Sequence, residues 1–286
     1  MRTGVDCVPV VIGGMSFGIT IFGGVMMKSM KSMIMLLVLA IAGFAEADVV
    51  LPTGLTGFWE FSDSTDVAHA TVGTALGLHN VSNADWVLGG LGGALYVQKT
   101  PEKSYLEMTH NIGPNGGGSY VNEWSILMDI MVPQSSMGNW VALYQTNPSN
   151  TNDGDFFVKN NPPGQIGVAA TGYSTNTISG DTWYRVVVSV DNGSFYRIYV
   201  NGSQWLEGNV QAIDGRFSLD PTLLIFADED GEDYPKYCST LAIWDRSLTG
   251  AEIASVGNAS TAIVPEPATI ALLCLGGLGI IGRKRR

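Results

Sequence analysis

Cysteine is scarce in this sequence, and its placement excludes an internal disulfide framework. The 286 residues include three cysteines. Cys7 precedes the first long apolar run and Cys274 lies in the last one, so the middle of the chain holds only Cys238. No disulfide can therefore form within that middle part. A domain of about two hundred residues needs none, since it buries enough apolar surface without covalent links.

Positive charge is also scarce. Between residues 48 and 264, eight basic residues stand against 23 acidic ones, which leaves a formal net charge of −15. Such a surface repels a phosphate backbone, which argues against nucleic acid as a partner. It suits divalent cations, neutral glycans or plain solubility.

Motifs of common catalytic sites are missing. There is no Gly-x-Ser-x-Gly elbow and no Walker loop, and His69, His79 and His110 do not form a zinc spacing with the cysteines. We therefore expect a protein that is not an enzyme.

The first feature that is present is an export signal. Lys28 and Lys31 precede an apolar run over residues 33–44, and Ala45 and Ala47 are the small residues of a cleavage site. The pattern predicts a signal peptide within residues 1–47, cut after Ala47 by signal peptidase. Methionines at positions 26, 27 and 30 are candidate start residues, which suggests that residues 1–25 are an over-long start. An uncleaved anchor helix is the alternative.

The end of the chain has three parts in a fixed order. They are a proline motif, an uncharged stretch over residues 268–282 and a basic stub: Pro265, Glu266, Pro267, then Arg283, Lys284, Arg285, Arg286. The stretch predicts a transmembrane helix of about 22 Å, short for a bilayer but workable when the basic stub snorkels on the cytoplasmic side. An ordinary membrane anchor is one interpretation.

This tail over residues 265–286 resembles the PEP-CTERM sorting signal of bacteria. The resemblance implies cleavage by an exosortase, a membrane-embedded enzyme, close to Pro265, Glu266 and Pro267. Prolines keep such a segment extended, as a protease requires. The resemblance thus implies an exported protein of the cell surface or extracellular space, anchored only transiently in the inner membrane.

The middle of the chain predicts an all-β domain over residues 48–257, followed by a tether over 258–264. Short β-branched and aromatic runs alternate with Gly, Asn and Asp, a spacing typical of a sandwich or barrel. The expected strands lie at residues 57–61, 94–97, 124–130, 140–144, 156–158, 165–168 and 223–226. Residues 183–190 and 195–200 flank an Asn-Gly turn and predict a hairpin. Its second strand places Tyr196, Ile198 and Val200 on one face.

Several of these runs resemble laminin G-like, concanavalin A-like domains. Residues 183–188 and 197–202 are similar to two signature strands, residues 241–249 and 251–253 to the closing strand and short helix, and residues 58–61 to the opening strand. The resemblance covers nearly all of residues 53–257 and implies a jelly roll of two antiparallel sheets. Ser239 and Thr240 stand where the family has an acidic pair before its last strand, which puts any role of those acids in doubt.

The glucanase pattern of paired carboxylates that some of these folds carry is also missing. Glu229 and Asp230 are adjacent, so on a strand their side chains would face opposite ways.

One dense acidic cluster follows the strand expected at residues 223–226. Carboxylates this close repel one another unless solvent or a cation intervenes, and calcium takes six to eight oxygen ligands. We therefore consider a calcium site, against a plain solvated loop, formed by Asp228, Asp230, Glu232 and Asp233. Asp153 and Asp155 form a weaker candidate of the same kind.

Seven tryptophans are candidates for stacking on sugars. Four begin or end expected strands beside apolar residues and are assigned to the core: Trp59, Trp124, Trp183 and Trp244. Trp86 and Trp205 lie among glycines and asparagines and are the candidate ligand-binding residues, with core packing as the alternative. Asn201 and Asn258 begin glycosylation sequons, which in a bacterial export context we expect to mark turns.

These patterns favour an exported binding module of the cell surface or matrix that recognises a glycan or exopolysaccharide. A structural or adhesive matrix protein that binds another protein is the first alternative. A glycoside hydrolase with an unrecognised site is the second.

Overall fold

The computed structural model describes residues 7–12, 15–20, 49–90, 92–101, 103–149, 154–228 and 231–264. The chain divides into two units, residues 1–47 and 48–286. In the first unit, β1 (Cys7–Ile12) and β2 (Met15–Thr20) pair as an antiparallel hairpin. The predicted signal-peptide core and the tail over 265–286 lie outside the described residues. Among the described residues, no helix is both long and apolar enough to cross a bilayer.

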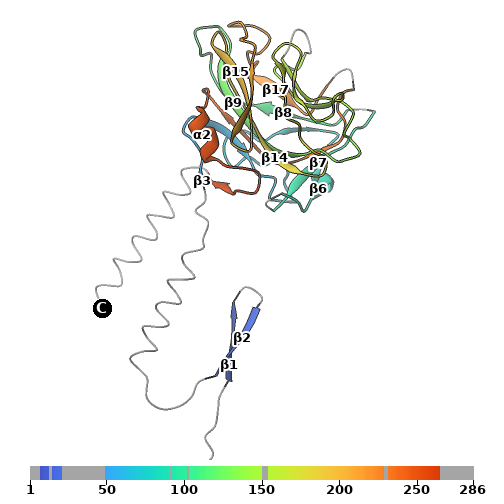
Figure 1. Cartoon of the computed structure of the whole chain (residues 1–286), viewed down its shortest axis with the longest axis vertical. Coiled ribbons are helices and arrows are strands. Elements are labelled where there is room, and N and C mark those ends of the chain that lie inside the picture. Colours follow the sequence, from blue (N-terminus) through green and yellow to red (C-terminus); the bar gives the residue numbers. More distant parts are fainter. Residues whose placement is uncertain are drawn as a thin grey trace, which may run out of the picture. The chain divides into compact units, whose positions relative to one another are not determined.

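The second unit is a sandwich of two antiparallel sheets, which confirms the expected fold (Figure 1). One sheet has the order β13-β12-β11-β10-β17-β8-β5. Its strands are β5 (Gly77–His79), β8 (Tyr105–Thr109), β10 (Val141–Gln145), β11 (Asp155–Val158), β12 (Ile166–Val168), β13 (Gly172–Tyr173) and β17 (Thr222–Ile225).

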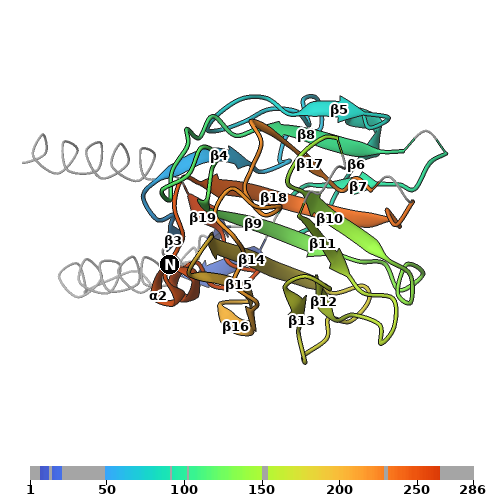
Figure 2. The same cartoon turned by 90° about the horizontal axis from the view of Figure 1, so that it is seen from above.

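The other sheet has the order β16-β15-β14-β9-β18-β7-β6, with β4 also paired to β18 (Figure 2). Its strands are β4 (Leu55–Trp59), β6 (Trp86–Val87), β7 (Ala94–Val97), β9 (Glu123–Met131), β14 (Trp183–Asp191), β15 (Phe195–Val200), β16 (Ser203–Gly208) and β18 (Lys236–Trp244). The expected hairpin is confirmed as β14 and β15. Ser239 and Thr240, expected before the last strand, lie inside β18 at a bulge.

The main core fills the space between the two sheets. Every second residue of β9, β14 and β15 points into it, including Tyr196, Ile198 and Val200 as alternation predicts. The hydroxyl oxygens of Tyr144 on β10 and Tyr196 on β15 lie 2.7 Å apart and are buried. This hydrogen bond joins the two sheets through the core.

A second apolar cluster covers the outer face of the larger sheet. Leu127, Val187 and Trp244 lie on that face beneath Ile253 of the short helix α2 (Gly250–Ser255). Because both faces of β9 and β14 are covered, most of their residues are buried, and the strands lack the half-polar pattern of a one-sided sheet.

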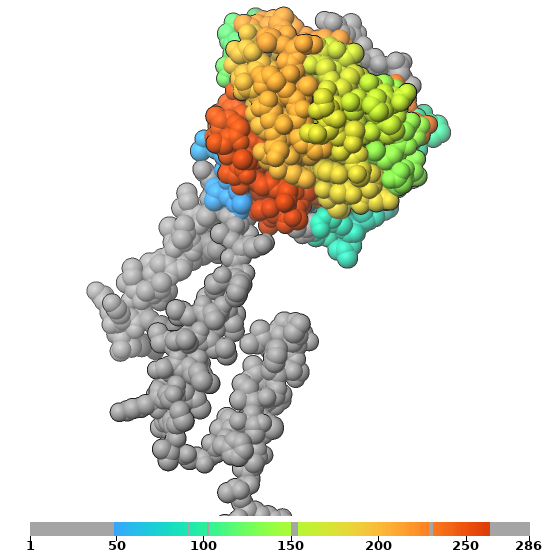
Figure 3. Space-filling model, in the orientation of Figure 1, coloured from blue at the N-terminus to red at the C-terminus, as the bar shows by residue number. Residues whose placement is uncertain are grey.

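The two ends of the domain meet at this outer face. β3 (Val49–Val50) pairs in parallel with β19 (Ile263–Val264), and Ile263 is buried in the second cluster. In Figure 3 the blue residues after position 48 and the red residues near position 260 lie beside each other. Residues 258–264, expected as a tether, are therefore packed against the sheet.

Candidate binding site

A buried ion pair organises the outer face of the larger sheet. Arg185 on β14 and Asp129 on β9 lie opposite each other in the ladder, and both side chains are fully buried. The guanidinium donates from Nε to Oδ1 at 2.8 Å and from Nη2 to Oδ2 at 2.7 Å. It also donates to the carbonyl oxygens of Val256 and Thr261. The pair therefore holds the segment after α2 against the sheet.

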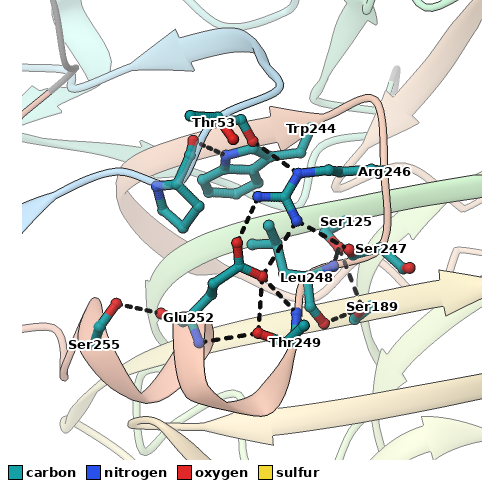
Figure 4. A network of polar contacts seen from close by, with 11 residues as sticks. Thr53, Ser125, Ser189, Trp244, Arg246, Ser247, Leu248, Thr249, Glu252 and Ser255 are labelled. Atoms are coloured by element: carbon teal, nitrogen blue, oxygen red, sulfur yellow. Dashed lines mark hydrogen bonds and ion pairs between the residues drawn. The ribbon is translucent and has the colours of Figure 1, made fainter.

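A second polar network attaches α2 to the last strand (Figure 4). Thr249 caps the helix, and its backbone N–H donates to the carboxylate of Glu252 at 2.8 Å. Arg246 donates to both oxygens of the same carboxylate. The hydrogen bond from Arg246 lowers the pKa of Glu252 to about 2. The sequence pattern over residues 241–253 therefore has a structural role, because its polar residues fix the start of α2 to the chain that follows β18.

The acidic loop lies at the end of β17, and two lysines approach it. Lys99 Nζ is 3.6 Å from Oδ1 of the buried Asp233, and the fully buried Lys236 donates to the carbonyl oxygen of Asp233 at 2.9 Å. Burial lowers the pKa of Lys236 to about 7, although the negative charge of Asp233 acts to raise it. Two lysine side chains therefore lie close to Asp233, one of the acidic residues of this loop.

The four carboxylates predicted to bind calcium are only partly described. Asp228 is buried and accepts a hydrogen bond from the backbone N–H of Glu232 at 2.8 Å. Asp230 and Asp153 lie outside the described residues. Within the described part of the chain, no three His, Cys, Asp or Glu side chains are grouped to hold a metal ion. Calcium binding at this loop stays a prediction.

The tryptophans are distributed differently from the sequence prediction. Trp59, Trp124 and Trp244 are fully buried as expected. Trp86 and Trp205 are partly buried, and both pack against the main core. They belong to β6 and β16, the two opposite edges of the larger sheet. The structure therefore does not bring these two candidate residues into one site.

Trp183, assigned to the core from its sequence context, lies in a cavity instead. It is partly exposed, and neither apolar cluster of the described residues includes it or has it packed against its surface. The cavity has a volume of about 300 Å³ and is lined by Gly90, Trp183, Asn201, Asn258, Ala259 and Ser260. The lining combines an aromatic ring with two side-chain amides. Ligand-binding pockets typically combine apolar surface with a few polar groups in this way. Sequence patterns missed this site because its sides come from four distant segments.

A smaller cavity of about 110 Å³ is lined in part by Arg185. Glu60, Ser239 and Thr240 line it together with Ile263 and neighbouring residues. Among the described residues that line this cavity, one carries a carboxylate, Glu60.

Residues 119–254 match the family model described as the concanavalin A-like lectin/glucanases superfamily. Residues 264–286 match the PEP-CTERM protein-sorting motif. The sandwich is a concanavalin A-like, laminin G-like jelly roll. The PEP-CTERM motif implies export and sorting to the cell surface. No curated protein matches the sequence.

Solved structures share the concanavalin A-like fold at low sequence identity. The botulinum neurotoxin serotype D binding domain has a TM-score of 0.50 and 14% identity, over 71% of this chain and 50% of that one. The binding domain of Paraclostridial Mosquitocidal Protein 1 has a TM-score of 0.50 and 13% identity, over 70% and 51%. Trypanosoma rangeli sialidase has a TM-score of 0.53 and 15% identity, over 80% and 38%. This chain thus spans about half of the two binding domains, and the likeness shows the fold alone.

Proposed function

We propose that this chain is a non-catalytic binding module of the bacterial cell surface or matrix, and that its ligand is a neutral glycan or exopolysaccharide. The observation that carries the proposal is the concanavalin A-like sandwich placed directly before a PEP-CTERM motif. Two structural neighbours are named as binding domains, which supports the proposal by analogy of fold. The strong negative charge favours an uncharged ligand over an acidic one.

Processing is the second part of the proposal. Signal peptidase cuts after Ala47, the stretch over 268–282 holds the chain in the inner membrane, and an exosortase then cuts near Pro265, Glu266 and Pro267. Val264, directly before Pro265, pairs with Val50, so the proline motif follows immediately after β19 in the chain. Mass spectrometry of the protein from its host should find Asp48 at the N-terminus and no peptide containing Arg286. A mature protein that retains Arg286 contradicts the cleavage.

Binding is tested with the secreted protein on a glycan array and on the host's own exopolysaccharide. Retention on neutral glycans is expected, with weak or no retention on polyuronates. Failure to bind any glycan, together with capture of a defined matrix protein, would favour the adhesive alternative. Release of reducing sugar from bound polysaccharide would show a hydrolase and overturn the non-catalytic proposal.

A further inference from the structure

We propose that the cavity around Trp183 is the saccharide-binding site of this domain. In this site a neutral sugar ring stacks on the indole and accepts hydrogen bonds from the side-chain amides of Asn201 and Asn258. The inference rests on the proposed function and makes it specific. The cavity, at about 300 Å³, lies at the lower end of the range for small-molecule sites.

The amide of Asn201 is oriented by the backbone of β14. Its Oδ1 accepts from the backbone N–H of Arg185 at 2.9 Å, and its own backbone N–H donates to the Arg185 carbonyl at 2.8 Å. Only the oxygen of an amide accepts a hydrogen bond, so the positions of Oδ1 and Nδ2 follow from this contact. Among the described residues, the Nδ2 group of Asn201 has no hydrogen-bond acceptor. It is a donor available to a ligand.

Asn258, which also lines the cavity, repeats this arrangement. Its Oδ1 accepts from the backbone N–H of Ser260 at 2.9 Å and from the Ser260 hydroxyl at 2.5 Å. This turn again uses the oxygen and leaves Nδ2 without an acceptor in the described part of the chain. Two amide donors on separate segments therefore face one cavity, which suits the hydroxyl oxygens of a sugar.

Trp183 supplies an aromatic surface to the same cavity. The chain passes the edge of its ring at Gly89 and Gly90, where a Cβ atom would lie 3.5 Å and 3.8 Å from the indole Cζ2. At Gly90, where φ is +58°, a Cβ atom would also approach the Cβ of Ser239 to 2.6 Å. The glycines thus let the backbone run close to the ring edge. An aromatic face left partly open is the surface on which the apolar side of a sugar packs.

The site is held in place before any ligand arrives. The guanidinium of Arg185 donates to the carbonyl oxygens of Val256 and Thr261, which flank Asn258 and Ser260 on both sides. The loop that carries one wall is therefore fixed to the strand that carries Trp183. Such preorganisation lowers the entropy lost on binding.

The lining of the cavity also selects against charged sugars. The described residues that line it include no Lys, Arg or His, and residues 48–264 have a formal net charge of −15. An acidic sugar would meet no compensating cation and an unfavourable overall field. A neutral sugar needs only the donors and the ring that the cavity provides.

The test uses the secreted full-length protein in affinity gel electrophoresis with dextran, barley β-glucan, galactomannan and, as the charged control, alginate. Asn201→Asp and Asn258→Asp keep the accepting oxygen of each turn and remove the donor, and Trp183→Ala removes the ring. Trp140→Ala is the matched control, because it makes the same substitution at another partly buried tryptophan, which packs on Phe157 and Tyr173 and does not line the cavity. Thermal melts confirm that each variant is folded.

The expected result is binding to at least one neutral polysaccharide that weakens by about tenfold or more in Trp183→Ala and Asn258→Asp. The control variant Trp140→Ala should stay within about twofold of the wild type. Wild-type binding that survives in folded Trp183→Ala would overturn the site and leave the proposed function standing. A wild type that binds none of the neutral polysaccharides and none of its host's exopolysaccharide would overturn both. Preferential binding to alginate would overturn the inferred neutral specificity.

Discussion

Arg185 and Asp129 form a bidentate ion pair in which neither side chain is exposed to solvent. Burial raises the pKa of the Asp129 carboxyl, and the guanidinium of Arg185 opposes that rise. The same guanidinium holds two carbonyl oxygens of the C-terminal segment. One buried cation thus links two central strands to residues more than 70 positions later in the chain.

Removing the partner of this cation should destabilise the domain strongly. Asp129→Ala leaves the Arg185 guanidinium buried without its carboxylate, which costs about 3–5 kcal/mol. Urea unfolding followed by tryptophan fluorescence measures the change. Arg197→Ala is the control, because its pair with Glu207 is largely exposed and is worth less than about 1 kcal/mol. Equal losses in the two variants would contradict the structural role of the buried pair.

The joint between Arg246 and Glu252 should make stability depend on acid pH. The pKa of Glu252 is lowered in the folded state from 4.5 to about 2, so its contribution is complete above pH 4.5 and is lost as pH falls toward 2. Because the pair is about one-third exposed, Glu252→Gln should cost only about 1 kcal/mol at pH 7. Urea unfolding at several pH values between 2 and 7 should show the two proteins converging at low pH. Parallel curves would rule out this linkage.

Lys236 should produce a pH dependence of the same sign at neutral to alkaline pH. Burial lowers its pKa from 10.5 to about 7, so between these values the unfolded chain holds more protons than the folded one. The free energy of unfolding contributed by this group therefore rises with pH from 7 to about 10.5. In Lys236→Met that rise should be absent, and the difference between wild type and variant should increase over this range. Lys159→Met serves as a surface control, and a pH-independent difference for Lys236→Met would refute the prediction.

Calcium binding at the acidic loop is tested by thermal unfolding with and without calcium. Millimolar calcium should raise the melting temperature of the wild type, because a ligand of the folded state alone stabilises it by mass action. Asp228→Asn should reduce the shift. An unchanged melting temperature would reject the site and leave Lys99 and Lys236 as the cations that accompany these carboxylates.

Much of the sandwich could be predicted from local patterns. β-branched runs bounded by Gly and Asn predicted most of the strands to within a residue or two, and the Asn-Gly turn predicted the hairpin of β14 and β15. Trp124 and Trp244 were assigned correctly to the interior, since their apolar neighbours fill the same clusters. Trp86 and Trp205 were predicted to bind a ligand because their sequence neighbours are polar. Local polarity does not show which distant residues pack against an indole ring, and both rings pack against the main core.

The sequence alone determined the all-β sandwich and the sorting tail, because alternation, turn residues and the PEP-CTERM pattern are local features of the chain. Only the tertiary structure decided which of Trp183 and Arg185 is buried, because strand alternation places both on the same face of β14. Residues 256–263 fold back over that face and bury Arg185, while Trp183, two positions away, stays beside an open cavity. The difference depends on which distant segment covers each side chain, and no local pattern records such long-range packing.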